Sequence, residues 1–188
     1  SAGTSDFTDG TLPSGVLDMP AGQSTFTINV PVASDWTFES DKTFKLVLDT
    51  PEPGLSITDA ESTGTITNDD ALIALADNVS VNEANGSATF SVSRSGDTSA
   101  DVTVTWTLTP KVSVLGSGDI SGAMSGTVTI AAGQTTADVV IGIANDFISE
   151  GNEEFTLTLS NPTVGASLGG RSLGWRVAIR KGDVGERW

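Results

Sequence analysis

Residues 34–44 read SDWTFESDKTF, and residues 145–155 read NDFISEGNEEF, so the same acidic and aromatic pattern returns 111 positions later. Other landmarks keep this offset: Ala21-Gly22-Gln23 recurs as Ala132-Gly133-Gln134, and Thr50-Pro51 as Asn161-Pro162. A period of this length is that of a whole small domain rather than of a solenoid unit. The chain is therefore predicted to be a tandem repeat of one domain type, in which the acidic block is a fixed part.

The repeat divides the 188 residues into three parts. We expect residues 1–70 to be the C-terminal part of a truncated domain, 71–170 a nearly whole domain, and 171–188 a divergent basic tail with room for one last strand. The chain starts at Ser1 without an initiator Met, so we expect it to be a piece of a longer protein. No flexible linker separates the copies, which predicts that they abut. The tail has two open interpretations, a native terminus or out-of-frame translation.

Apolar residues alternate with Thr and Ser along most of the chain, as in residues 102–108, VTVTWTL. Successive side chains of a strand point to opposite faces, so each such segment is predicted to be a half-buried strand, with Trp106 in the core. Turn signals such as Asn85-Gly86 separate the segments, which indicates an all-β antiparallel sandwich. The predicted strands are residues 15–20, 24–32, 43–49 and 62–67 in the first copy, and 76–82, 87–94, 101–109, 126–131, 136–144, 154–160 and one after 170 in the second.

The composition excludes several classes of function. Without Cys or His, the chain has no disulfides, Cys nucleophiles, Cys/His zinc sites or Ser-His relays. Its 24 acidic and 9 basic residues give a formal charge of −15, which repels nucleic acid and anionic lipid and attracts cations. A glycosidase-like carboxylate pair would need sugar-stacking aromatics, which are scarce here, and no apolar run approaches the roughly 20 residues that span a bilayer. We therefore expect no enzyme activity, no nucleic-acid binding and no direct membrane insertion.

The acidic residues suggest a site for a hard cation. Calcium takes about six to eight oxygen ligands, more than one short segment here offers, so its ligands would have to converge from loops at one end of a sandwich. The candidates of the second copy are Glu83, Asp119, Asp146, Glu150 and Glu153, and those of the first copy are Asp6, Asp35, Glu39, Asp69 and Asp70. The alternative is that these carboxylates only solvate loops or pair with Lys and Arg.

The order of these motifs resembles the Calx-beta domain family, found in sodium/calcium exchanger regulatory loops, integrin beta-4 and large bacterial surface proteins. The resemblance is carried by residues 81–86 (VNEANG) leading into 90–96 (FSVSRSG), by Gly118-Asp119, by residues 145–155, and by residues 64–70 (GTITNDD). It implies a seven-stranded immunoglobulin-like, Greek-key sandwich whose distal loops bind calcium. It also implies that the ten candidate residues divide into two calcium sites, one in each copy.

Three departures from the family pattern concern these sites. In the first copy Lys42 stands at the position that Glu153 holds in the second, so an ammonium replaces a carboxylate. The first copy also lacks the strand that would carry a counterpart of Glu83. In the second copy the 111-residue offset aligns Val177 with Ile66 and puts Arg180-Lys181 where the first copy has Asp69-Asp70. Both sites are therefore expected to be incomplete.

These features predict a calcium-binding structural or adhesion module of a large extracellular protein, either secreted or on a bacterial cell surface. This parent protein is expected to be membrane-associated. Calcium would neutralise the clustered carboxylates and stiffen the array. The expected partners are calcium ions and neighbouring repeats, with other surface proteins as further candidates, and the expected processes are cell adhesion and cell communication. The alternative is a metal-independent spacer in a surface-protein stalk, whose stability calcium would leave unchanged.

Overall fold

The computed structural model describes residues 1–49, 51–76, 79–110, 118–145, 153–169 and 175–180, the last segment by its backbone alone. Within these residues the regular elements are strands, apart from two 3-10 helices of three residues, η1 (Thr4–Asp6) and η2 (Glu83–Asn85). The chain forms two compact units. The first comprises residues 1–35 and 39–68, and the second comprises residues 36–38 and everything from Asp69 onward.

The first unit is built around one antiparallel pair of strands, β1 (Lys42–Val47) and β2 (Glu61–Ile66). Phe44 of β1 stands opposite Gly64 of β2, and its ring fills the place that a side chain at this glycine would need. Phe7 is buried against Phe44 in an edge-to-face arrangement, with 5.7 Å between the ring centroids. The two phenylalanines therefore form an apolar centre for this unit.

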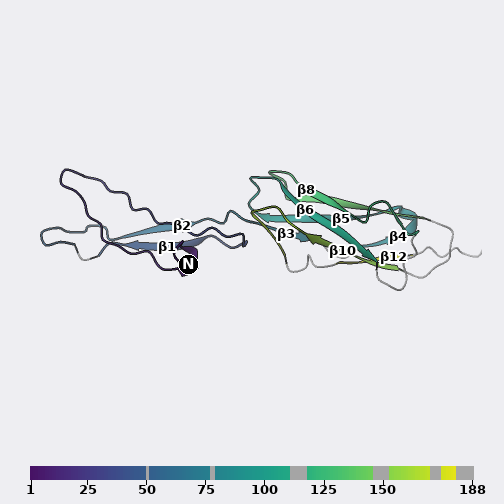
Figure 1. The fold of residues 1–188 in the computed structure, drawn as a ribbon, viewed down its shortest axis with the longest axis horizontal. Coiled ribbons are helices and arrows are strands. Elements are labelled where there is room, and N and C mark those ends of the chain that lie inside the picture. The colour runs from purple at the N-terminus through teal and green to yellow at the C-terminus, as the bar shows by residue number, and fades with distance from the viewer. Residues whose placement is uncertain (50, 77–78, 111–117, 146–152, 170–174, 181–188) are drawn as a thin grey trace, which may run out of the picture. The chain divides into compact units, whose positions relative to one another are not determined.

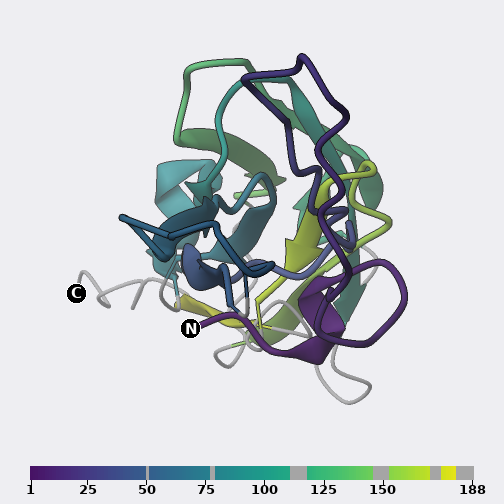
Figure 2. The same ribbon diagram turned by 90° about the vertical axis from the view of Figure 1, so that its left-hand side faces the viewer.

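Two strands predicted for the first unit do not form. Residues 15–20 and 24–31 have no ladder partner, and both stretches are drawn as tube in Figures 1 and 2, while Val32 makes a single bridge to Phe7. Their alternating apolar side chains face water, with Val16 98% and Phe26 53% exposed. An alternating strand needs a neighbouring strand for its amides and an opposing layer for its apolar face, and the described part of the first unit provides neither. The other two predicted strands do form, as β1 and β2.

The second unit is a sandwich of two five-stranded sheets (Figure 1). The first sheet has the order β4 (Ser80–Asn82), β12 (Trp175–Arg180), β10 (Glu153–Ser160), β6 (Val102–Pro110) and β8 (Ser125–Ile130). The second has the order β11 (Ala166–Leu168), β3 (Ala71–Leu75), β5 (Ser87–Gly96), β9 (Thr136–Ile143) and β7 (Ile120–Ser121). The pairs β11–β3 and β12–β4 are parallel, and the other pairs are antiparallel. The predicted all-β sandwich is confirmed.

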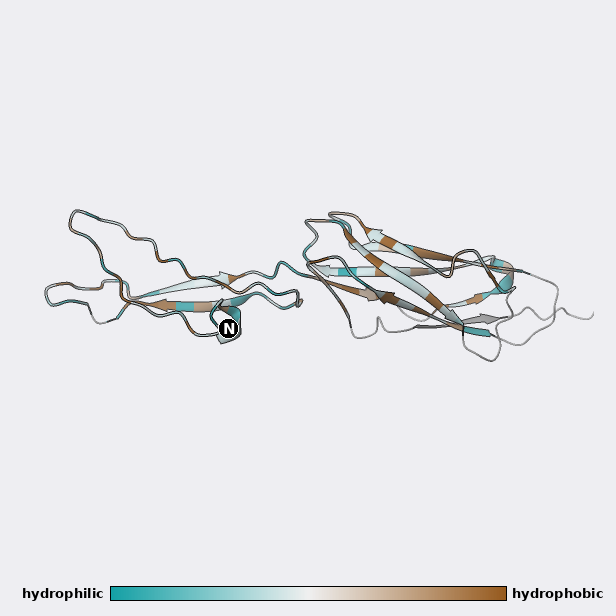
Figure 3. Ribbon diagram, viewed as in Figure 1, coloured by the Kyte–Doolittle hydropathy of each residue, from teal (hydrophilic) through white to brown (hydrophobic). Residues whose placement is uncertain are grey.

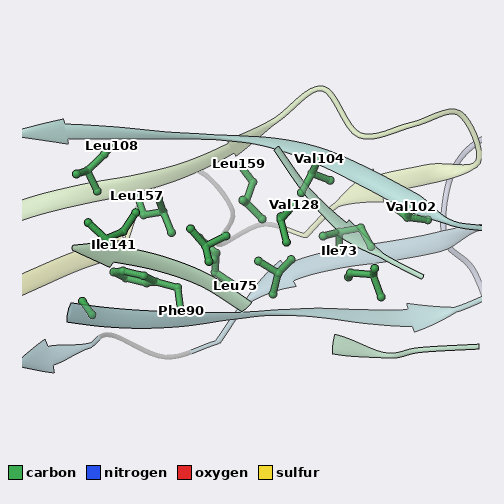
Figure 4. Close-up of a cluster of buried hydrophobic side chains, with 14 of the residues drawn as sticks. Ile73, Leu75, Phe90, Val102, Val104, Leu108, Val128, Ile141, Leu157 and Leu159 are labelled. Atoms are coloured by element: carbon green, nitrogen blue, oxygen red, sulfur yellow. The ribbon is translucent and has the colours of Figure 1, made fainter. Parts of the chain in front are cut away.

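The core lies between the inner faces of these sheets. Along β10 every second residue is buried, and the strands of this unit show apolar bands separated by polar ones in Figure 3. Figure 4 shows Phe90 and Ile141 of one sheet facing Leu157 and Leu159 of the other. Phe155 is completely buried, and its ring meets that of Phe90 edge-on at 6.2 Å between centroids.

The first strand of the second unit differs from the prediction. Instead of one strand over residues 76–82, the structure has β3 at 71–75 in one sheet and β4 at 80–82 in the other. The prediction was wrong because residues 71–75, ALIAL, are an apolar run without clear alternation, which a period of two does not mark as a strand. Short β7 and β11, of two and three residues, were also not predicted.

Trp106 is only partly buried, although the sequence predicted a core position. It packs against the core, and its ring also lies over Gly126, its partner on β8. A side chain at residue 126 would collide with the indole. The glycine therefore makes room for a large aromatic ring on a neighbouring strand, as Gly64 does for Phe44 in the first unit.

We expect Phe155→Ala to destabilise the second unit by about 3–5 kcal/mol, because the change removes a fully buried ring and leaves a cavity beside Phe90. Denaturant unfolding followed by circular dichroism measures the loss. Val140→Ala on β9 is the matched control, since Val140 is 60% exposed and its truncation should change stability by no more than about 0.5 kcal/mol. Equal losses in the two variants would contradict the assignment of the core.

Candidate metal centre

The described acidic candidates of the second unit lie at one end of the sandwich, where β4, β9 and β12 end and β5 and β10 begin. Three backbone contacts tie these strand ends together. Ile143 N donates to Gly86 O at 2.9 Å, Glu153 is paired with Ile179, and Arg180 is paired with Asn82. We call this region, with Glu83, Asp119 and Glu153, the acidic end of the second unit.

Glu83 is placed by the turn that carries the chain from β4 to β5. It begins η2, and the side chain of Asn82 caps this turn by accepting a hydrogen bond from Ala84 N at 3.0 Å. Gly86 closes the turn with a φ of 70°, a left-handed conformation that glycine adopts without strain. The local sequence Asn-Glu-Ala-Asn-Gly therefore turns between the two sheets, and it leaves Glu83 only 4% exposed.

Asp119 and Glu153 are buried at the same end. Asp119 is 4% exposed, and its backbone carbonyl accepts a hydrogen bond from Ala144 N at 2.9 Å, just beyond the end of β9. Glu153 is 1% exposed at the start of β10. Through Ile179 of β12 it stands in the same row of the sheet as Val81, two residues before Glu83.

Three buried carboxylates at one end need compensation by hydrogen bonds or by positive charge, because burial of an ionised carboxylate is costly. Each of the three takes part in a polar or electrostatic interaction within the molecule. Among the described residues no three acidic side chains are close enough together to hold a metal ion. Asp146 and Glu150, the other two candidates of this site, lie outside the described residues. The donor chemistry at this end, carboxylate oxygen alone, is that of a hard divalent cation.

The register of β12 corrects the predicted alignment of the two copies. Glu153 is paired with Ile179, as Lys42 is paired with Ile66, so Ile179 rather than Val177 takes the place of Ile66. The last strand is thus shifted by two residues, and the basic pair Arg180-Lys181 corresponds to Thr67-Asn68 instead of the aspartate pair. Strand alternation has a period of two, so it fits both alignments equally well.

In the first unit, two of the candidates meet at a lysine. Lys42 Nζ lies 2.6 Å from Asp6 Oδ1 and also forms an ion pair with Glu39 Oε2. The second carboxylate oxygen of Asp6 accepts a hydrogen bond from Gly3 N at 2.6 Å. These bonds, the one from Lys42 above all, hold the pKa of Asp6 below its ordinary value, and the two carboxylates raise the pKa of Lys42. We call Asp6, Glu39 and Lys42 the lysine cluster.

A pair of residues that the sequence did not point to supports this cluster. Glu39 N donates to Asn68 Oδ1 at 2.9 Å, and Asn68 N donates to Asp41 Oδ1 at 3.0 Å. Asp41 and Asn68 are far apart in the sequence, and each is a common loop residue, so no local pattern could have linked them. They hold the loop that carries Glu39 against the end of β2.

The remaining candidates of the first site are Asp35, Asp69 and Asp70. Asp35 is exposed. Asp69 is exposed and Asp70 is buried, and both belong to the second unit, where they precede β3. The carbonyl of Asp70 accepts a hydrogen bond from Asp97 N at 3.1 Å, at the end of the sandwich opposite Glu83. Their assignment to a calcium site stays a prediction.

Sequence comparison decides the family. The sequence model of the Calx-beta domain matches residues 3–71 and again residues 72–174. The chain belongs to the Calx-beta domain family. The suspected resemblance is thereby confirmed, and no curated protein matches the chain.

Several solved Calx-beta structures share the fold. The apo form of the Calx CBD1 domain has a TM-score of 0.52 at 24% identity, covering 59% of this chain and 98% of that domain. CBD12 from CALX1.2 has a TM-score of 0.54 at 23% identity, covering 60% of this chain and 46% of that protein. The Calx CBD2 domain has a TM-score of 0.54 at 14% identity, covering 60% and 88%. At these identities the likeness shows the Calx-beta fold and not the details of a site.

The two described helices, η1 and η2, have three residues each. Within the described residues, none has the length and apolar character that crossing a membrane requires.

We expect the carboxyl group of Asp6 to titrate below its ordinary value of 3.8 in the folded chain, because the Lys42 ammonium and the Gly3 amide favour the charged form. A group with a lowered folded pKa contributes stability that is complete above its unfolded pKa and is lost as the pH falls through the folded value. The lysine cluster should therefore weaken below about pH 4. Side-chain carboxyl NMR measures the midpoint. Lys42→Gln should raise it, and a midpoint unchanged by this substitution would contradict the pairing.

Proposed function

We propose that this Calx-beta chain is a calcium-binding structural module of a large extracellular protein. We propose further that calcium binds at the acidic end of the second unit. The observation that supports this most is the burial of Glu83, Asp119 and Glu153 at one end of the sandwich. Three separate loops or strand ends supply them, and a cation with about six to eight oxygen ligands draws its ligands from several segments in this way. Structural neighbours include a protein described as the calcium binding domain CBD12 of CALX1.1.

The mechanism is electrostatic. Without a cation, carboxylates at the ends of β4, before β7 and at the start of β10 repel one another, and the loops that carry them open more easily. Glu83, Asp119 and Glu153 would hold a divalent cation at these strand ends, and it would supply the positive charge that offsets their repulsion. The chain's own residues do the positioning: the Asn82 cap and Gly86 fix Glu83, and the Ala144 amide fixes the backbone at Asp119.

The setting that we propose is extracellular, on a secreted or cell-surface protein with roles in adhesion and communication. The strongly acidic chain and its tandem domains support a repeat whose neighbours are further domains of the same kind. We propose binding rather than catalysis, because the clustered side chains are carboxylates without a His, Cys or Tyr that could share in proton transfer or nucleophilic attack.

A metal-independent spacer is the second candidate function. The lysine cluster favours it for the first unit, because there the acidic side chains are neutralised from within the chain. For the whole protein the two functions differ in one measurable property, the response of stability to calcium.

We expect millimolar calcium to raise the thermal stability of the chain, since a ligand that binds the native state alone contributes about 2.7 kcal/mol at a hundredfold excess over its Kd. Asp119→Asn should abolish most of this shift, because it removes a carboxylate at the acidic end. Thermal unfolding with and without calcium, followed by circular dichroism, measures the shift within each variant and so separates it from any general loss of stability.

Asp138→Asn is the matched control. Asp138 lies in the middle of β9, opposite Ser91 and exposed, so its substitution should leave the calcium shift intact. A chain without any calcium response would support the spacer function. An equal response in both variants would place the calcium elsewhere.

A further inference from the structure

We infer that the ammonium of Lys42 is the resident cation of Asp6 and Glu39, so that the first unit binds no calcium at this place and the calcium response of the chain comes from the second unit alone. The assignment of the calcium response to the second unit rests on the proposed function. The role of Lys42 rests on the lysine cluster alone.

The geometry of the lysine cluster is that of a bound cation. Lys42 Nζ contacts carboxylates from two other segments, Asp6 at the end of η1 and Glu39 in the loop before β1. An ammonium has three donors and no acceptor, and here at least two of the donors point at carboxylate oxygens. The Lys42 side chain is 24% exposed and that of Asp6 11%, so the contact is largely shielded from solvent.

The residues of this cluster do not fit calcium. Calcium needs about six to eight oxygen ligands, and one of the groups at this place, the Lys42 ammonium, is positively charged at neutral pH. A divalent ion would have to displace the ammonium from Asp6 and Glu39 and remain close to it. Asp6 is also engaged on its other oxygen by the Gly3 amide, which reduces its capacity to serve as a ligand.

The cluster is held by a frame of hydrogen bonds, so it is a built arrangement rather than a chance surface pair. Ala2 N donates to Thr43 O at 2.8 Å, and Ala33 N donates to Asp6 O at 2.9 Å. Glu39 N is fixed by Asn68 Oδ1. Lys42 therefore links the N-terminal segment, the acidic loop and the β1–β2 ladder, the same task that a metal ion performs when it ties loops together.

The internal repeat offers a comparison within one molecule. Lys42 and Glu153 occupy equivalent positions, at the start of β1 and of β10, and each is paired with an isoleucine of the last strand. One position thus carries a cation in the first copy and a buried carboxylate in the second. The first unit thus has a positive side chain at the position where the second unit adds a further carboxyl group to its acidic end.

The test is NMR of the full chain with calcium as the probe. In the wild type, the Gly3, Glu39 and Asn68 amides should not shift with millimolar calcium, whereas amides at the acidic end, such as Ala84 and Ala144, should. Lys42→Gln should speed hydrogen exchange at the Gly3 amide at least tenfold, because Asp6 loses the partner that holds it. Lys42→Arg keeps a positive charge at this position and should retain most of the protection.

Lys45→Gln is the matched control on the same strand. Lys45 also forms one ion pair, 2.7 Å from Glu61, but it is 65% exposed and joins two neighbouring strands only, so its loss should not alter the Gly3 amide. The inference is overturned if calcium shifts the wild-type Gly3 and Glu39 amides, or if Lys42→Gln and Lys45→Gln leave equal protection. If Ala84 and Ala144 fail to respond while Lys42→Gln behaves as expected, the proposed function fails and the role of Lys42 stands.

Discussion

A strand of alternating apolar and polar residues is stable only where both its backbone and its apolar face find partners, and this constraint explains the difference between the two units. In the second unit, β5 and β9 pair with each other and face β6 and β10 across a shared core. In the first unit the counterpart of β9, residues 24–32, has the same alternation and remains largely in water. The pattern of the side chains is alike, but the neighbouring strands are not. Whether an alternating segment of this protein forms a strand therefore depends on its neighbouring strands and not on its own sequence alone.

Charge is arranged by the same topology. The ends of strands from both sheets meet at the acidic end of the second unit, and three carboxylates are buried there. In the first unit the corresponding place is filled by Lys42, which pairs with two carboxylates at once. Equivalent positions of the two copies thus carry opposite charges, an ammonium at Lys42 and a carboxyl group at Glu153. The fold sets this position, and the residue that stands there decides the sign of its charge.

Much of the fold could be predicted from the sequence, because alternation and turn residues mark strands directly. The positions of β5, β6, β8, β9 and β10 were predicted to within a few residues. Alternation could not distinguish two alignments that differ by two residues, so the predicted alignment of β12 with β2 was wrong. It also could not show that residues 71–75 are a strand, since an apolar run without a polar face has no period.

The candidate site was predictable in part for a related reason. The topology of a sandwich brings loop residues to one end, so the convergence of Glu83, Asp119 and Glu153 toward one end could be anticipated from their order in the chain. The hydrogen bonds of Asn68 with Asp41 and Glu39 could not, because they join residues that are distant in sequence and individually unremarkable in type. The sequence showed that Lys42 departs from the family pattern. It did not show that the Lys42 ammonium pairs with both Asp6 and Glu39.

The parallel pairing of β4 with β12 determines how the second unit would carry a pulling force. β3 starts at one end of the sandwich, and β12, the last described strand, stops at the other end. Tension along the chain therefore draws β12 and the β3–β4 segment in opposite directions, along the strands. Loaded in shear, the hydrogen bonds of the β4–β12 ladder must give way together, whereas a hairpin pulled at its open end loses them one at a time. We therefore expect a repeat with this connection to resist stretching, although β4 and β12 share only a short ladder.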